Sequence, residues 1–116
     1  MKRVPISHAL TLAVVIGGLV PATARADSQV RYTNRSGRVL HLYFAVASYG
    51  TDIDCRDLVY GGTVDPDSSW QHFVPSKYWT WVRFLEDPSQ GGCASKARAE
   101  WQYDGTSYGY RAQNVW

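Results

Sequence analysis

The sequence of 116 residues predicts an all-β fold, an antiparallel β-sandwich of about seven strands. Apolar and polar residues alternate with a period of two over several short segments, and no segment shows the apolar stripe of an amphipathic helix. Residues that favour turns (Gly, Pro, Asn and Asp) separate these segments. Five Trp, eight Tyr and three Phe, all after residue 26, provide large side chains for the core of a small domain.

The first 26 residues have the composition of a secretory signal peptide. Residues 2–3 are basic, residues 9–20 form an uncharged apolar run, and residues 24–26 end the segment with small side chains in an A-x-A pattern. The apolar run is shorter than the roughly 20 residues that a membrane-spanning helix needs. We therefore predict a cleaved leader over 1–26, one domain over 27–116, and export to the periplasm or the extracellular space without membrane attachment.

Removal of the leader changes the charge balance. The whole chain has 12 basic and 10 acidic residues, but Lys2, Arg3 and Arg25 belong to the leader, so nine basic and ten acidic residues remain. The mature domain therefore lacks the basic character that is typical of nucleic-acid-binding proteins, and no nucleic-acid partner is expected.

The first half of the mature chain predicts two strands and a loop. A strand over about 29–33 ends at a turn, residues 34–37, whose Asn and Gly tolerate left-handed backbone. In the next strand, apolar residues at 40, 42, 44 and 46 share one face. An acidic loop over 48–57 follows, and a short apolar segment, 58–60, is expected to stop at two glycines.

The middle of the chain predicts two further strands. Residues 64–68 form a turn, because proline presets its second position and Asp bonds back to the chain. Strands follow over 70–74 and 78–85. The second is apolar on both faces, which is typical of a central strand or of a strand with one face against a partner.

The last segments are less clear in pattern. Residues 94–103 are rich in alanine, but alanine and aromatic residues alternate with polar ones, which favours a strand over a helix. Asp104-Gly105 then predicts a hairpin into a last strand over about 106–112.

The two cysteines, Cys55 and Cys93, are predicted to form one disulfide, since an exported small domain commonly carries one. A loop of about 39 residues closed in this way stabilises the fold by about 4 kcal/mol in the chain-entropy account. Metal binding is the weaker alternative, because the chain has no C-x-x-C motif and the mature part has only His41 and His72. We expect no metal and no cofactor.

Three segments resemble the von Hippel–Lindau β domain family. Residues 30–40 carry its Asn-Arg-Ser turn between two strands, residues 63–68 match the turn before its middle strands, and residues 79–87 (WTWVRFLED) match its tryptophan-bearing strand. The resemblance covers roughly 29–88. It implies a seven-stranded β-sandwich that acts as a binding module.

The domain of the eukaryotic family member binds hydroxyproline in a peptide through a pocket of aromatic, serine and histidine side chains. Phe44 falls on its first pocket aromatic residue and Trp81 on its later tryptophan. The pocket serine and histidine fall near Val74 and Trp79, which supply neither polar contact. The resemblance therefore does not imply hydroxyproline recognition here, and ubiquitin-ligase function is not expected.

No motif predicts catalysis. Residues 105–109 match the G-x-S-x-G pattern of serine hydrolases, but that pattern needs a strand-to-helix elbow, and here it follows a predicted hairpin. Asp52, Asp54 and Asp57 lack the glycine and spacing of a calcium loop. We expect a protein that is not an enzyme.

The aromatic side chains are the best candidates for function. Two faces of one strand cannot both be fully buried in a small sandwich, so some rings should reach solvent and bind a partner. The sequence predicts a non-catalytic module for an unknown protein or peptide, with a glycan- or cell-wall-binding module and a small exported enzyme as alternatives. The candidate binding residues are Phe44, His72, Tyr78, Trp79, Trp81 and Arg83.

Overall fold

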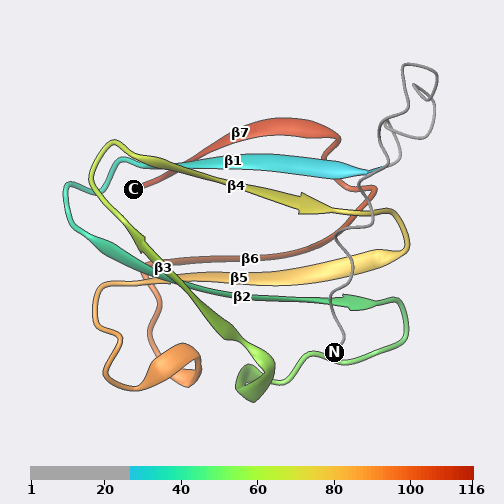
Figure 1. Ribbon diagram of the computed structural model, residues 1–116, viewed down its shortest axis with the longest axis horizontal. Helices are drawn as coiled ribbons and strands as arrows, with labels where there is room; N and C mark the ends of the chain where they lie inside the picture. Colours follow the sequence, from blue (N-terminus) through green and yellow to red (C-terminus); the bar gives the residue numbers. More distant parts are fainter. Residues whose placement is uncertain (1–26) are drawn as a thin grey trace.

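The computed structural model describes residues 27–116, and the predicted leader lies outside the described residues. These residues form two packed β-sheets, which confirms the predicted all-β sandwich (Figure 1). In this part of the chain, no helix has the length and apolar character to cross a membrane. The strands are β1 (Ser28–Asn34), β2 (Leu40–Ser48), β3 (Val59–Val64), β4 (Ser69–Val74), β5 (Tyr78–Leu85), β6 (Ala99–Asp104) and β7 (Tyr110–Val115).

The two sheets differ in size and in strand direction. The three-stranded sheet has the order β4-β1-β7, and the four-stranded sheet has the order β3-β2-β5-β6. All neighbouring strands are antiparallel except β1 and β7, which run parallel. The last strand therefore lies beside the first one, and β1 is the central strand of its sheet.

The β3 strand continues through the two glycines at which the sequence predicts its end. A Cβ atom on Gly61 would come within 3.0 Å of the Phe44 ring and 3.1 Å of Leu42, so only glycine fits against these side chains without a shift. Gly62 has a φ of 102°, and the register of β2 and β3 shifts next to Leu42. The glycines thus form a bulge with close strand contact, not a stop.

The predicted hairpin at Asp104-Gly105 is wrong. Among the described strands, β6 pairs with β5, whereas β7 pairs with β1 in the other sheet and begins four residues later than predicted. The Gly105 N–H donates to the Tyr78 carbonyl at 2.8 Å, and a Cβ atom on Gly105 would lie 1.9 Å from the Pro75 carbonyl oxygen. The glycine is needed because two backbones approach closely where the chain crosses between the sheets. The strand predicted over 94–103 is also shorter, since it begins at Ala99.

The space between the sheets holds an aromatic core. The fully buried Tyr32 ring lies 5.7 Å from Trp70, 5.3 Å from Phe84 and 5.2 Å from Trp101, measured between ring centroids. The hydroxyls of Tyr32 and Tyr103 share a hydrogen bond of 2.7 Å between the sheets. Burial raises the pKa of Tyr103 to about 12 and raises that of Tyr32 further. Eight of the sixteen aromatic residues therefore lie in this core or pack against it.

Candidate functional site

The predicted disulfide is confirmed and lies on the outer side of the four-stranded sheet. It joins two short 3-10 helices, η3 (Cys55–Asp57) and η4 (Gly91–Cys93), with a distance of 5.0 Å between the two Cα atoms. Next to it, Leu58 and Ala94 pack with two sheet residues, Tyr43 and Leu85, in a second small core. The two loops are thus held to the sheet by the covalent bond and by apolar contacts together.

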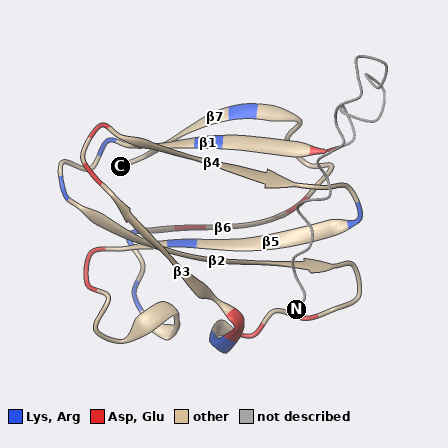
Figure 2. Ribbon diagram, in the orientation of Figure 1, with Lys and Arg blue, Asp and Glu red and all other residues tan. Residues whose placement is uncertain are grey.

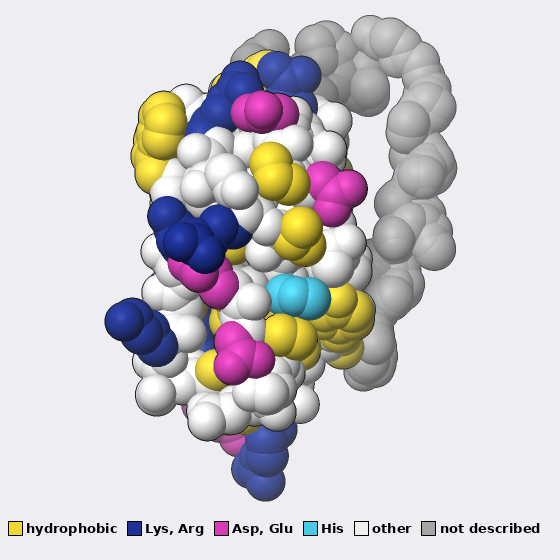
Figure 3. Space-filling model, turned by 90° about the vertical axis from the view of Figure 1, so that its left-hand side faces the viewer, with side chains coloured by type: hydrophobic (Ala, Val, Ile, Leu, Met, Phe, Trp, Pro, Cys, Tyr) yellow, Lys and Arg dark blue, Asp and Glu magenta, His cyan; other side chains and the backbone are white. Residues whose placement is uncertain are grey.

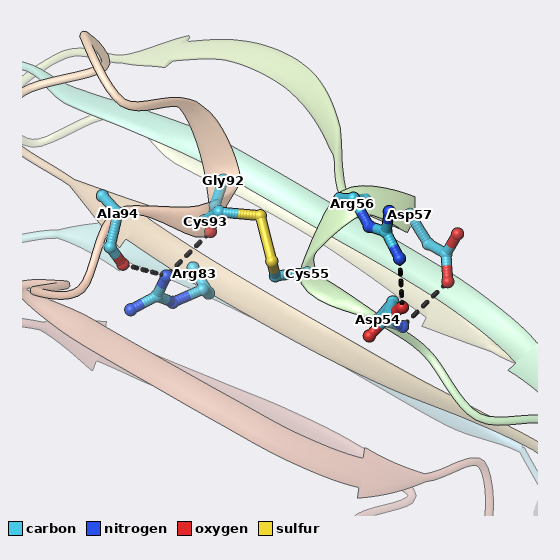
Figure 4. Close-up of a disulfide and its surroundings, with 8 residues drawn as sticks. All are labelled: Asp54, Cys55, Arg56, Asp57, Arg83, Gly92, Cys93 and Ala94. Atoms are coloured by element: carbon cyan, nitrogen blue, oxygen red, sulfur yellow. Dashed lines mark hydrogen bonds and ion pairs between the residues drawn. A yellow bond between two sulfur atoms is a disulfide. The ribbon is translucent and has the colours of Figure 1, made fainter.

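Arg83 on β5 links the η4 loop to the four-stranded sheet. It is buried, and its Nη1 donates to the carbonyl oxygens of Gly92 at 2.7 Å and Ala94 at 2.5 Å (Figure 4). Its Nε donates to Glu100 at 2.7 Å. The Nε and Nη1 atoms of Arg83 are therefore bonded within the fold, where they hold the η4 loop against the sheet.

Three of the predicted site residues, Phe44, His72 and Tyr78, pack with the core between the sheets. The His72 Nε2 atom lies 2.9 Å from Thr80 Oγ1, and that hydroxyl donates to the Ala45 carbonyl at 2.7 Å. Thr80 therefore accepts a hydrogen bond from His72, which fixes the neutral tautomer with its proton on Nε2. Burial lowers the pKa of His72 to about 3.

Trp79 and Trp81 lie on the opposite side of β5, on the outer face of the four-stranded sheet. Ala45 pairs with Trp81 in the register of β2 and β5, so Trp81 and Phe44 point to opposite sides of the sheet and cannot line one pocket. Trp79 Nε1 donates to the Thr51 carbonyl at 2.8 Å, and Trp81 packs on the second core. The structure thus does not bring the six predicted residues together, and neither tryptophan is fully exposed.

Other aromatic side chains on the strands reach solvent: Tyr60 on β3 is 52% exposed on the outer side of the four-stranded sheet, and two more lie on the three-stranded sheet. Phe73 on β4 is 49% exposed and Tyr110 on β7 is 65% exposed. Gln29 on the central strand β1 pairs with both, so the three side chains form one row across the outer face of the three-stranded sheet. We call this outer surface the β4–β1–β7 face; its three rows are Phe73-Gln29-Tyr110, Gln71-Arg31-Ala112 and Ser69-Thr33-Asn114.

The sequence does contain one indication of this surface, namely an aromatic residue on the polar side of a strand. In β4, Trp70, His72 and Val74 alternate with Ser69, Gln71 and Phe73, so the pattern places Phe73 on the polar side of the strand. A large aromatic side chain among polar neighbours on a solvent-facing side is the informative exception. Tyr110 could not be assigned in the same way, because the wrong hairpin shifted the predicted last strand.

Charge is distributed unevenly over the molecule. In β1, β4 and β7 the charged residues are Arg31 and Arg111, both basic (Figure 2). The outer side of the four-stranded sheet carries Glu100 and Asp104 on β6. The end of the sandwich that faces the viewer in Figure 3 carries basic and acidic side chains next to one another. Two ion pairs of the turns between strands are Arg35–Asp67 at 3.0 Å and Arg38–Glu86 at 3.7 Å.

A shallow cleft of about 400 Å³ lies between the loop after β5 and the segment before β6, and its lining includes Glu86, Lys96 and Arg98. Arg98 donates to Glu86 and to the Trp116 carbonyl, so part of its polar lining is already paired within the chain. Within residues 27–116, no group of three or more His, Cys, Asp or Glu side chains is placed to hold a metal ion.

Comparisons with models of known protein families, with curated proteins and with solved structures find no match for this chain. The resemblance to the von Hippel–Lindau β domain therefore stays a prediction, and the function has to be argued from the surface itself.

Proposed function

We propose that the mature chain is an exported, non-catalytic module that binds a protein or peptide partner through the β4–β1–β7 face. The observation that carries this proposal is the composition of that face. Its nine residues include Phe, Tyr and Arg but no Lys, Asp or Glu. The centres of protein interfaces are enriched in aromatic residues and Arg and depleted in Lys, Glu, Asp, Ser and Ala. The face departs from this composition only at Ser69 and Ala112.

The geometry of the face also supports binding. Phe73 and Tyr110 lie two strand spacings apart, about 10 Å, with only the flexible amide of Gln29 between them. Both rings are therefore within reach of one partner segment. Because they are carried by strands of a sheet rather than by loops, little backbone entropy is lost when they bind.

The size of the face favours a short segment over a large folded partner. Three strands and a strand length of five residues give about 10 by 13 Å between the outer Cα atoms. A stable interface between folded domains needs about 800 Å² on each side. Nine side chains fall short of that area, so an extended peptide segment is the better fit.

Export rests on two features of the chain. The first 26 residues have the pattern of a secretory leader. The Cys55–Cys93 disulfide agrees with an oxidising compartment, in which such bonds form and persist.

Photo-crosslinking tests the proposal. A photoreactive phenylalanine analogue that replaces Tyr110 is expected to crosslink the mature protein to a partner in the compartment to which it is exported. Tyr60 provides the matched control, because it is 52% exposed and lies on β3 in the other sheet. Crosslinking from position 110 should disappear when Phe73 is also replaced by Ser. Equal products from positions 110 and 60 would refute the proposal.

A glycan is the second candidate ligand, because five of the nine residues are amides or hydroxyls, which bond well to sugar hydroxyls. Exposed aromatic rings can also stack on the apolar sides of sugar rings. A glycan array tests this alternative. If the protein binds a glycan, the Phe73→Ser variant does not, and no protein is crosslinked, the ligand is a glycan and not a protein.

A further inference from the structure

We infer that the segment bound on the β4–β1–β7 face is acidic and that one of its carboxylates pairs with Arg31. This inference rests on the proposed function. Arg31 occupies the centre of the face, because it lies on the central strand in the middle row, between Gln71 and Ala112. Neither neighbour can neutralise its charge.

Arg31 has no ionic partner within the described chain. The five ion pairs among residues 27–116 involve Arg35, Arg38, Arg56, Arg83 and Arg98. Arg31 is exposed and takes part in none of them. Its guanidinium group is therefore available to a ligand, in contrast to that of the buried Arg83.

The nine positions of this face include no carboxylate side chain. None of the nine positions holds Asp or Glu, although the mature chain has ten acidic residues. Asp27 precedes β1, and its carboxylate accepts a hydrogen bond from the Ser76 N–H at 2.8 Å. On the neighbouring strand, the guanidinium carbon of Arg111 lies 4.5 Å from the centroid of the Tyr108 ring. The nine positions of the face and the neighbouring Arg111 thus include basic side chains and no acidic one.

The position of Arg31 makes the charge of the partner matter. A segment that contacts both Phe73 and Tyr110 covers or closely approaches the middle row, so it removes water from Arg31. An arginine that loses water without gaining a partner is costly, and a basic residue opposite it is worse. A carboxylate accepts two parallel hydrogen bonds from the planar guanidinium group. It thus replaces the lost water and neutralises the positive charge.

A peptide-display selection on the immobilised mature protein tests this inference, with a Phe73→Ser, Tyr110→Ser variant used to remove peptides that bind elsewhere. The retained peptides are expected to contain more Asp and Glu than the starting library. For single peptides, Asp→Asn substitution and the protein variant Arg31→Gln should each weaken binding about tenfold, and the two losses should not add. Arg56→Gln is the matched control, because Arg56 is exposed in η3 on the other sheet's side, and it should leave binding unchanged.

The outcomes separate the inference from the proposed function. Retained peptides without an acidic excess, or unchanged affinity in Arg31→Gln, would overturn the inference while the binding face stands. A selection that retains no peptide dependent on Phe73 and Tyr110 would overturn both. Heparin serves as an anionic polysaccharide probe; if it binds in an Arg31-dependent way while no peptide does, the ligand is an anionic glycan and the inferred peptide is wrong.

Discussion

Arg83 and Arg31 each lie on an inner strand of their sheet, yet their surroundings differ. Arg83 is buried and bonds to two loop carbonyls and to Glu100. Arg31 is exposed and has no ion pair in the described chain. Both occur at alternating positions of strands, so the sequence pattern could not tell the structural arginine from the available one. Arg83 is buried because the disulfide-linked loops pass over its side of the sheet, whereas no loop within residues 27–116 covers Arg31.

Replacement of Arg83 by Met should destabilise the fold. The substitution keeps much of the side-chain length but leaves the carbonyls of Gly92 and Ala94 without their donor. We expect a loss of about 2–4 kcal/mol in the free energy of unfolding, measured by urea denaturation. Glu100→Gln is the comparison: it keeps an acceptor for Arg83 Nε and removes only the paired charge, so it should cost less than Arg83→Met. Equal losses in the two variants would show that the carbonyl contacts contribute nothing.

The buried His72 makes stability depend on pH in the acid range. Burial lowers its pKa from 6.5 to about 3, so between these values the unfolded chain binds a proton that the folded chain does not. Its contribution is fully present above pH 6.5 and is lost as the pH falls toward 3. We expect the unfolding free energy of a His72→Phe variant to fall less steeply than that of the parent over this range. Parallel curves would contradict a buried neutral His72.

At the scale of elements, Gly105 shows how a local signal can predict the wrong partner. The Asp-Gly pair reads as a hairpin, but here it turns the chain from one sheet to the other, against the backbone of Pro75. Gly105→Ala should therefore cost about 3 kcal/mol, because backbone atoms cannot move aside as a side chain can. Gly109→Ala, where no heavy atom lies within 4 Å but φ is +60°, should cost about 1 kcal/mol. Thermal denaturation of the two variants measures the difference, and a smaller loss at 105 would refute the close approach.

The disulfide joins two elements that the sheets alone do not hold. The bonded cysteines are 38 residues apart, which corresponds to about 4 kcal/mol of stabilisation in the chain-entropy account. A Cys55→Ser, Cys93→Ser variant should melt about 15 °C or more below the parent. The apolar contacts of Leu58 and Ala94 work in the same direction, so the loops should stay near the sheet at low temperature. An unchanged melting temperature would contradict the structural role of the bond.

The elements differ in how far their sequence could predict them. The β1, β2 and β4 strands follow from apolar residues spaced by two, because each strand has one side in the core. The β5 strand is apolar on both sides and follows instead from the turn residues that bound it. The pairing of β7 with β1 joins the two ends of the domain, and no local pattern encodes so distant a contact. The disulfide was predictable from the two cysteines and the leader-like pattern of the first 26 residues. The β4–β1–β7 face was not, since it requires knowing that three strands distant in sequence are neighbours.

At the scale of the whole molecule, the sandwich has two unlike outer sides. The outer side of the four-stranded sheet is partly covered by the disulfide-linked loops and carries acidic residues on β6. The outer side of the three-stranded sheet presents two exposed aromatic rings, a central arginine and no acidic residue. The loops that carry the disulfide thus lie away from the β4–β1–β7 face, which leaves that face uncovered for the partner that we propose.

The central claim is that the partner binds on the β4–β1–β7 face. Nuclear magnetic resonance of the isotope-labelled mature protein, titrated with an acidic peptide from the display selection, tests it most directly. We predict chemical-shift changes at the backbone amides of Gln29, Arg31, Phe73 and Tyr110, with the indole N–H signals of Trp79 and Trp81 unchanged. Shifts centred on Trp79 and Trp81, with the amides of β1, β4 and β7 unaffected, would contradict the account.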